Sequence, residues 1–227
     1  MLLAAVGLSI ASTAGCAGVL LRDDVESARI EWKLNPDGQR AAVYAEALHD
    51  AFTGRAYVDQ PAAFAQRAGE ALAALAAGET GSGSRRPTLV AYRGLLLLDL
   101  GRNHEGWAEL QRSMAIAPTL AAARGIFSVW GARGRNDEVA EACARTLPAM
   151  HDADGRFQLL DLCVKNMHTP TEAAALAWAP PGALAFYRHE RALREQAAAR
   201  ARQQASDIAQ AQQSMDIQAQ QSMDMAN

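Results

Sequence analysis

Apolar and small residues recur three or four positions apart between positions 87 and 118, in two runs that the sequence Gly-Arg-Asn separates. The first run contains Val90, Gly94 and Leu97, and the second contains Gly106, Trp107, Leu110 and Met114. This spacing places side chains on one face of an α-helix, so each run predicts an amphipathic helix. Because the link between them is short, the segment predicts an antiparallel helical hairpin.

The same pattern returns 33 positions further along the chain. The sequence Gly101-Arg102-Asn103-His104-Glu105 has its counterpart in Gly134-Arg135-Asn136-Asp137-Glu138. In the same alignment, Trp130, Cys143 and Leu147 take the places of Leu97, Leu110 and Met114. An internal repeat of this length predicts helical units that stack side by side.

A helix-turn-helix unit of about 34 residues, with glycine at the turn and proline at its end, resembles the tetratricopeptide repeat. The resemblance implies that Gly94 and Gly106 lie where the two helices cross closely. It also implies that Gly101 ends the first helix with a positive φ and that Pro118 stops the second helix. The resemblance is closest for residues 87–118.

The second unit, residues 120–150, departs from the repeat pattern. Phe127 and Val139 stand where the repeat has small residues, and the first unit lacks Trp or Tyr at its early large positions. A generic antiparallel helix pair is therefore the alternative interpretation.

Helical spacing extends over most of the remaining chain, and strand-like alternation is missing. Stripes predict one helix from 39 to 52, with Val43, Ala47, Leu48 and Ala51, and another from Pro61, with Phe64, Ala68, Ala71, Leu72 and Leu75. Further helices are expected at 22–32, at 154–167, at 170–178 with Thr169 as its N-cap, and at 183–205. We expect an all-α fold of stacked antiparallel hairpins, similar to a tetratricopeptide α-solenoid, with a long C-terminal helix and a low-complexity tail.

The chain divides into four expected parts. They are a signal peptide at 1–15, a tether with a short helix at 16–37, a repeat domain at 38–182, and the carboxy-terminal helix and tail at 183–227. In the last part, Leu184, Phe186, Tyr187 and Leu193 are expected to dock on the final hairpin. Residues 210–217 and 218–225 repeat the same octapeptide with one change, which predicts a frayed or disordered tail unless a partner helix orders it.

The first 15 residues are uncharged and end in Ser-Thr-Ala-Gly before Cys16. They are fewer than the roughly 20 apolar residues that span a bilayer. The segment resembles a bacterial lipoprotein signal, which implies diacylation of Cys16. Ala17, rather than Asp, next to that cysteine is compatible with the outer membrane, facing the periplasm. Thr13 replaces the usual Leu and an initial Lys or Arg is absent, so an ordinary cleaved signal or a buried helix stays open.

Cys143 and Cys163 fall on consecutive predicted helices. An envelope compartment would let them pair. Their distances from the predicted bend near Asp152 differ by about one turn, however, and a disulfide tolerates little misplacement. We therefore expect two buried free thiols.

The sequence contains no recognisable catalytic or metal-binding motif. Five histidines are scattered without a His-Glu-x-x-His or Cys-x-x-Cys pair, and no Gly-x-Ser-x-Gly elbow presents a serine. His151-Asp152-Ala153-Asp154 is better explained by helix capping than by metal binding. The net charge of −3 gives no electrostatic case for nucleic acid. We expect neither an enzyme nor a cofactor or metal.

Stacked hairpins present a concave wall formed by their first helices, which suits a peptide or a partner helix. The resemblance places its groove at Tyr92, Leu95, Leu98 and Asp99 in one unit and at Arg124, Ser128 and Ala132 in the next. Alternatively, the chain's own terminal helices cover Leu95 and Leu98. The expected function is an envelope-anchored adaptor that binds partner proteins during assembly of an outer-membrane, secretin or transporter complex. A structural subunit docked through its C-terminal helix is the alternative.

Overall fold

The computed structural model describes residues 5–80 and 83–225, with side chains for residues 18–80, 83 and 85–213. All regular structure in this part of the chain is helical, which confirms the all-α prediction. The α-helices are α1 (Ala5–Leu34), α2 (Gly38–Thr53), α3 (Pro61–Glu79), α4 (Arg86–Asp99), α5 (Asn103–Ile116), α6 (Leu120–Ala132), α7 (Asn136–Thr146), α8 (Ala153–Asn166), α9 (Glu172–Ala175) and α10 (Ala183–Met225). Two short 3-10 turns are η1 (Gly83–Arg85) and η2 (Leu147–Ala149).

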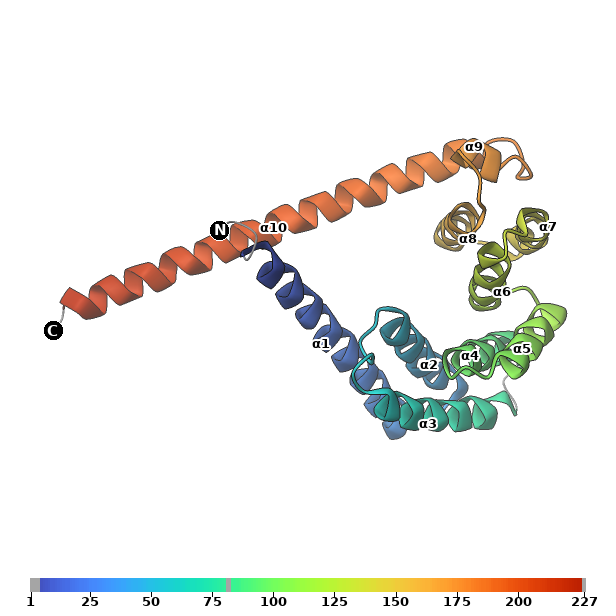
Figure 1. Ribbon diagram of the computed structural model, residues 1–227, viewed down its shortest axis with the longest axis horizontal. Coiled ribbons are helices and arrows are strands. Elements are labelled where there is room, and N and C mark those ends of the chain that lie inside the picture. Colours follow the sequence, from blue (N-terminus) through green and yellow to red (C-terminus); the bar gives the residue numbers. More distant parts are fainter. Residues whose placement is uncertain (1–4, 81–82, 226–227) are drawn as a thin grey trace.

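The helices pack in chain order along a curved row (Figure 1). Helix α2 packs against α3 and α4, α4 against α5 and α6, and α6 against α7 and α8. Helices α2, α4, α6 and α8 lie on the inner side of the curve, whereas α3, α5 and α7 lie on the outer side. Helix α1 packs against α2 at one end of the row, and α10 packs against α8 at the other end.

The hairpin of α4 and α5 confirms the predicted close crossing. A Cβ atom at Gly94 would lie 3.0 Å from the carbonyl oxygen of Gly106, and one at Gly106 would lie 2.8 Å from that of Gly94. The turn residue Gly101 has φ of 75° and its counterpart Gly134 has φ of 67°, as their places in the repeat require. The backbones therefore meet where only glycine leaves room.

The hairpin of α6 and α7 is built differently. Phe127 and Val139, which replace the two glycines, are fully buried. Helices α6 and α7 consequently approach each other less closely than α4 and α5 do.

The amino-terminal helices differ from the prediction in two ways: α1 is longer, and α2 buries a different face. Helix α1 is continuous from Ala5, whereas the sequence predicted a short helix from 22 to 32. On α2, Tyr44 is fully buried, whereas Val43 is 46% exposed, so the predicted stripe is wrong at Val43. Helix α2 packs against α1, α3 and α4, and these neighbours decide which of its faces is buried.

An ionic network joins α1 to α3. Glu70 on α3 accepts from Arg29 at 2.6 Å and lies 2.7 Å from the Lys33 amine, both on α1. The hydrogen bond from Arg29 is the main reason that the pKa of Glu70 falls to about 2.

The carboxy-terminal region also departs from prediction. Thr171 caps α9 by accepting from the Ala174 N–H, so the predicted cap at Thr169 is wrong. Helix α10 continues to Met225, beyond the expected end near 205, and the side chains of the tail from 214 lie outside the described residues. Tyr187 docks as expected, stacked on Phe157 at 5.6 Å between ring centroids.

Candidate protein-binding surface

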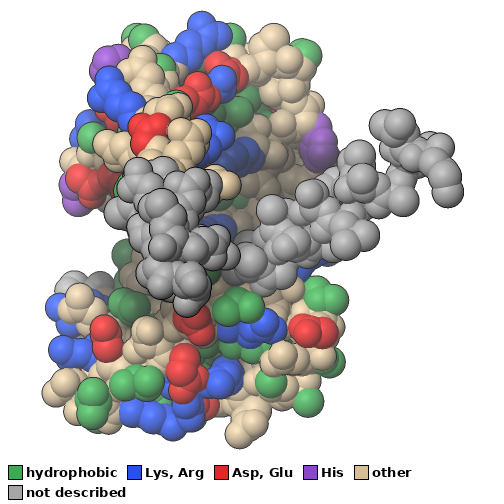
Figure 2. Space-filling view, turned by 90° about the vertical axis from the view of Figure 1, so that its left-hand side faces the viewer, with side chains coloured by type: hydrophobic (Ala, Val, Ile, Leu, Met, Phe, Trp, Pro, Cys, Tyr) green, Lys and Arg blue, Asp and Glu red, His purple; other side chains and the backbone are tan. Residues whose placement is uncertain are grey.

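The inner side of the curve is a hollow face lined by α2, α4, α6 and α8 (Figures 1 and 2). Figure 2 shows this hollow between the two ends of the row of helices, with basic side chains visible inside it. The predicted groove residues on α4 and α6 belong to two of these helices.

A buried polar pair lies between α2 and α4. The Nδ1 atom of His49 is 2.7 Å from the Oδ2 atom of Asp99, and both side chains are less than one tenth exposed. Burial raises the pKa of the Asp99 carboxyl, and the hydrogen bond with His49 opposes that rise. The pair therefore holds two helices of the inner wall together.

Tyr92 lies seven residues, or about two helical turns, before Asp99 on α4, and its side chain is only 7% exposed. Burial raises the pKa of its hydroxyl, and the nearby Glu46 carboxylate raises it further. Tyr92 thus faces α2 rather than open solvent.

Leu95 is 2% exposed because α6 covers it. A Cβ atom at Gly125 would lie 2.8 Å from its Cδ2 atom. A neighbouring repeat helix, and not the terminal helices considered from sequence, therefore covers this residue.

Three predicted groove residues keep accessible surface. Leu98 is half-buried, Ser128 is exposed and donates to the Gly125 carbonyl at 2.9 Å, and Arg124 is one third exposed. Arg124 reaches across to α2, where it pairs with Asp50 at 3.0 Å. The surface open to a partner is therefore smaller and more polar than the predicted groove.

The sequence reasoning missed the contribution of α2 to this surface. His49 and Asp50 follow Glu46 by three and four positions, and all three face the predicted groove residues of α4 and α6. Their spacing was the signal that could have identified them, since it places all three on one side of a helix.

A crevice lies between the hairpin of α4 and α5 and the hairpin of α6 and α7. A cavity of about 490 Å³ opens beside the turns, and one of about 270 Å³ opens between α5 and α7. The first is lined by Leu98, Asn103, His104, Trp107, Val129, Ala132 and Arg133, and the second by Trp107, Gln111, Met114, Ala115, Pro118, Ile126, Trp130, Ala142 and Arg145. Trp107 lines both cavities and meets Trp130 edge to face at 5.8 Å.

Two half-buried tryptophans, Trp107 and Trp130, line this crevice. Half-buried aromatic rings supply contact area at little cost in side-chain entropy. Arg133 at its edge is exposed and takes part in no ion pair among the described residues. We define the inter-hairpin crevice as these two cavities with Trp107 between them.

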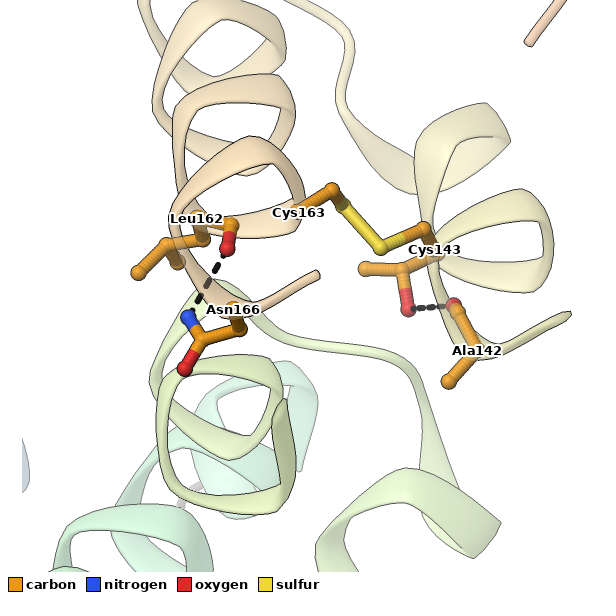
Figure 3. Close-up of a disulfide and its surroundings, with 6 residues drawn as sticks. Ala142, Cys143, Leu162, Cys163 and Asn166 are labelled. Atoms are coloured by element: carbon orange, nitrogen blue, oxygen red, sulfur yellow. Dashed lines mark hydrogen bonds between the residues drawn. A yellow bond between two sulfur atoms is a disulfide. The ribbon is translucent and has the colours of Figure 1, made fainter. Parts of the chain in front are cut away.

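Cys143 and Cys163 form a disulfide, so the expected pair of free thiols is wrong (Figure 3). Their Cα atoms lie 6.3 Å apart, and both residues are fully buried. The chain does bend at Asp152, as predicted, but η2 prolongs α7 to Ala149 and the extended residues Met150 and Asp152 add further length before α8. The connection therefore takes up the difference of about one turn that argued against pairing.

Other features bear on chemistry and on membrane association. The described residues hold no group of three or more His, Cys, Asp or Glu side chains arranged to bind a metal ion. None of the helices within that part of the chain is both long and apolar enough to cross a bilayer. The side chain of Cys16, the predicted lipidation site, lies outside the described residues.

No known protein family matches this chain, and neither does any curated protein or any solved structure.

Proposed function

We propose that this chain is a tetratricopeptide-like helical-repeat adaptor that binds a partner protein in a bacterial cell envelope. Its inner face and the inter-hairpin crevice are the binding surface, and a lipid on Cys16 is the membrane anchor. By resemblance, the partner belongs to an outer-membrane, secretin or transporter assembly.

The observation that carries the proposal is the inter-hairpin crevice. It combines Trp107 and Trp130, which are only half-buried, with accessible polar residues such as Ser128 on the adjoining inner face. An aromatic crevice with a polar rim suits an extended peptide or a helix of a partner. The lack of a catalytic cluster in the sequence motifs favours binding over chemistry.

The disulfide supports the proposed compartment. Disulfides persist in oxidising compartments such as the periplasm and are rare in the cytosol. The Cys143–Cys163 bond fits a chain that folds in the envelope.

A photo-crosslinking amino acid at Ser128 tests the binding surface in native membranes. We expect it to capture one envelope protein, identified by mass spectrometry, that the same reagent at Gln66, exposed on α3, does not capture. Ser128→Arg should reduce recovery of that protein at least several-fold, whereas Gln66→Arg should not. Equal recovery from both positions would count against the proposed surface.

Mass spectrometry of membrane-extracted protein tests the anchor separately. A mature chain that starts at an acylated Cys16 is expected. An intact chain with an unmodified Met1 would rule out the lipid anchor. This result would not bear on the proposed binding surface.

Helix α10 favours a second candidate function, that of a structural subunit docked through this helix. All its described side chains from residue 195 to residue 213 are exposed. Deleting residues 205–227 distinguishes the two, because an adaptor keeps its captured partner while a docked subunit loses its assembly.

A further inference from the structure

Helix α10 leaves the rest of the molecule after its first turns (Figure 1). Its contacts with α8 include Tyr187 on Phe157 and an ion pair of Arg194 with Asp154 at 2.7 Å. Beyond Arg194, every described side chain is exposed. With 43 residues the helix is about 65 Å long at 1.5 Å per residue, and the exposed stretch 195–213 accounts for about 28 Å of that length.

A helix gains most of its stability in proteins from packing, and isolated helices are marginal in water. The protruding part of α10 has apolar residues on one side, with Ile208 at 59% exposure in its middle. Ala197, Ala201 and Ala205 precede it at spacings of three or four, and Met215 and Ala219 follow in the sequence. This side is available to another helix.

The charges of α10 are separated along its length. Residues 188–202 contain five arginines and two glutamates, whereas residues 203–225 contain three aspartates, at 207, 216 and 224, and no Lys or Arg. Arg200 and Arg202 take part in no ion pair among the described residues. The sequence of α10 therefore has a basic segment followed by an acidic one.

Charge complementarity selects the partner and its direction. Two α10 helices side by side and antiparallel place the basic end of each beside the acidic end of the other, whereas a parallel pair places like charges together. A second copy of this chain supplies that complement without any other molecule. The resulting contact is isologous and closes as a two-fold dimer.

We propose that two copies of this chain associate through antiparallel contact of their α10 helices, with the two Ile208 residues facing each other near the two-fold axis. In this register, Ala201 lies level with Met215 of the second copy, and Arg202 lies near Asp216 of that copy. The dimer does not depend on the inter-hairpin crevice, so it stands whether or not the adaptor function is correct.

Cysteine crosslinking of the full-length protein tests both association and direction. Chains carrying Ala201→Cys are mixed with chains carrying Met215→Cys and treated with a short bismaleimide reagent. The mixture is expected to give a crosslinked dimer, whereas each variant alone gives little, because like positions lie 14 residues apart along the paired helices. The parent chain, in which Cys143 and Cys163 are paired in a disulfide, is treated with the same reagent as the background control.

A crosslink of Ala201→Cys chains with themselves would show parallel pairing and overturn the proposal. A monomeric mass by light scattering at high protein concentration, together with no crosslink in the mixture, would overturn it as well.

A charge-reversal experiment checks the electrostatic basis. Arg200→Glu with Arg202→Glu should raise the dissociation constant of the dimer by more than about tenfold, and the effect should shrink in high salt. Adding Asp216→Arg to the same chain should restore association, because both reversed ends again face opposite charges. The control Arg85→Glu changes an exposed arginine on η1 and should leave the dimer intact. Unchanged association in the double reversal would contradict the proposed contact.

Discussion

His49 on α2 and Asp99 on α4 lie 2.7 Å apart although 50 positions separate them in the sequence. Both side chains are almost fully buried, so neither has water to replace the other. Removing one member leaves a buried polar group without its partner, which costs more than removing both.

This relationship gives a prediction for a double-mutant cycle. His49→Ala alone should lower the free energy of unfolding by about 3 kcal/mol, since the Asp99 carboxylate stays buried and unpaired. The double variant His49→Ala with Asp99→Ala should lose less than the sum of the two single losses. Urea denaturation followed by circular dichroism measures all four free energies. Strict additivity would show that the two side chains do not interact.

The crossing of α4 and α5 gives a second prediction. Gly94→Ala should destabilise the protein by about 1–3 kcal/mol, because the added Cβ would lie 3.0 Å from the Gly106 carbonyl oxygen. The matched control is Gly69→Ala on α3, where a Cβ meets nothing within 4 Å. That change should stabilise the protein by about 0.5–1 kcal/mol through helix propensity. Thermal unfolding of the two variants gives opposite shifts if the crossing is as close as described.

The Cys143–Cys163 bond gives a third prediction. Intact mass spectrometry of protein purified without reductant should show about two daltons less than the reduced chain. Replacing both cysteines by serine should cost about 3 kcal/mol, the loop-closure value for a separation of 20 residues, plus the cost of two buried hydroxyls. If reductant leaves the urea midpoint of the parent chain unchanged, the bond does not stabilise the fold.

The network around Glu70 gives a prediction that depends on pH. Its pKa lies near 2 in the folded protein and near the ordinary glutamate value of 4.5 in the unfolded chain, so ionised Glu70 stabilises the fold above pH 4.5. That stability is lost as the pH falls from about 4.5 towards 2. Glu70→Gln should therefore cost about 1–2 kcal/mol at pH 7, allowing for solvent screening of a partly exposed pair, and progressively less below pH 4.5.

Urea unfolding at pH values from 3 to 7 measures this difference. The control Glu31→Gln removes an exposed carboxylate of α1 and should change little at any pH. If Glu70→Gln lowers the free energy of unfolding equally at pH 3 and pH 7, the ion pairs of the network do not stabilise the ionised form of Glu70.

Much of the helical layout was predictable because its signals are local. Gly101 and Gly134 mark turns through their own backbone conformation, and Pro61 and Pro118 mark a helix start and a helix end. Gly94 and Gly106 were also identified correctly, through the resemblance of residues 87–118 to the tetratricopeptide repeat.

The candidate surface was harder to predict. Tyr92 and Leu95 stand at groove positions of the repeat, yet α2 and α6 bury them. Contacts between hairpins depend on residues tens of positions apart. The spacing within one repeat unit does not specify these contacts. The same reason explains why the crevice beside Trp107 was not predicted.

The sequence by itself determined where helices begin, turn and end in the repeated region, because caps, glycine turns and apolar spacing act within a few residues. Only the tertiary structure decided which faces those helices cover. It buried Tyr44 in place of Val43 and brought Cys143 to Cys163, because burial and pairing are set by neighbours distant in the chain.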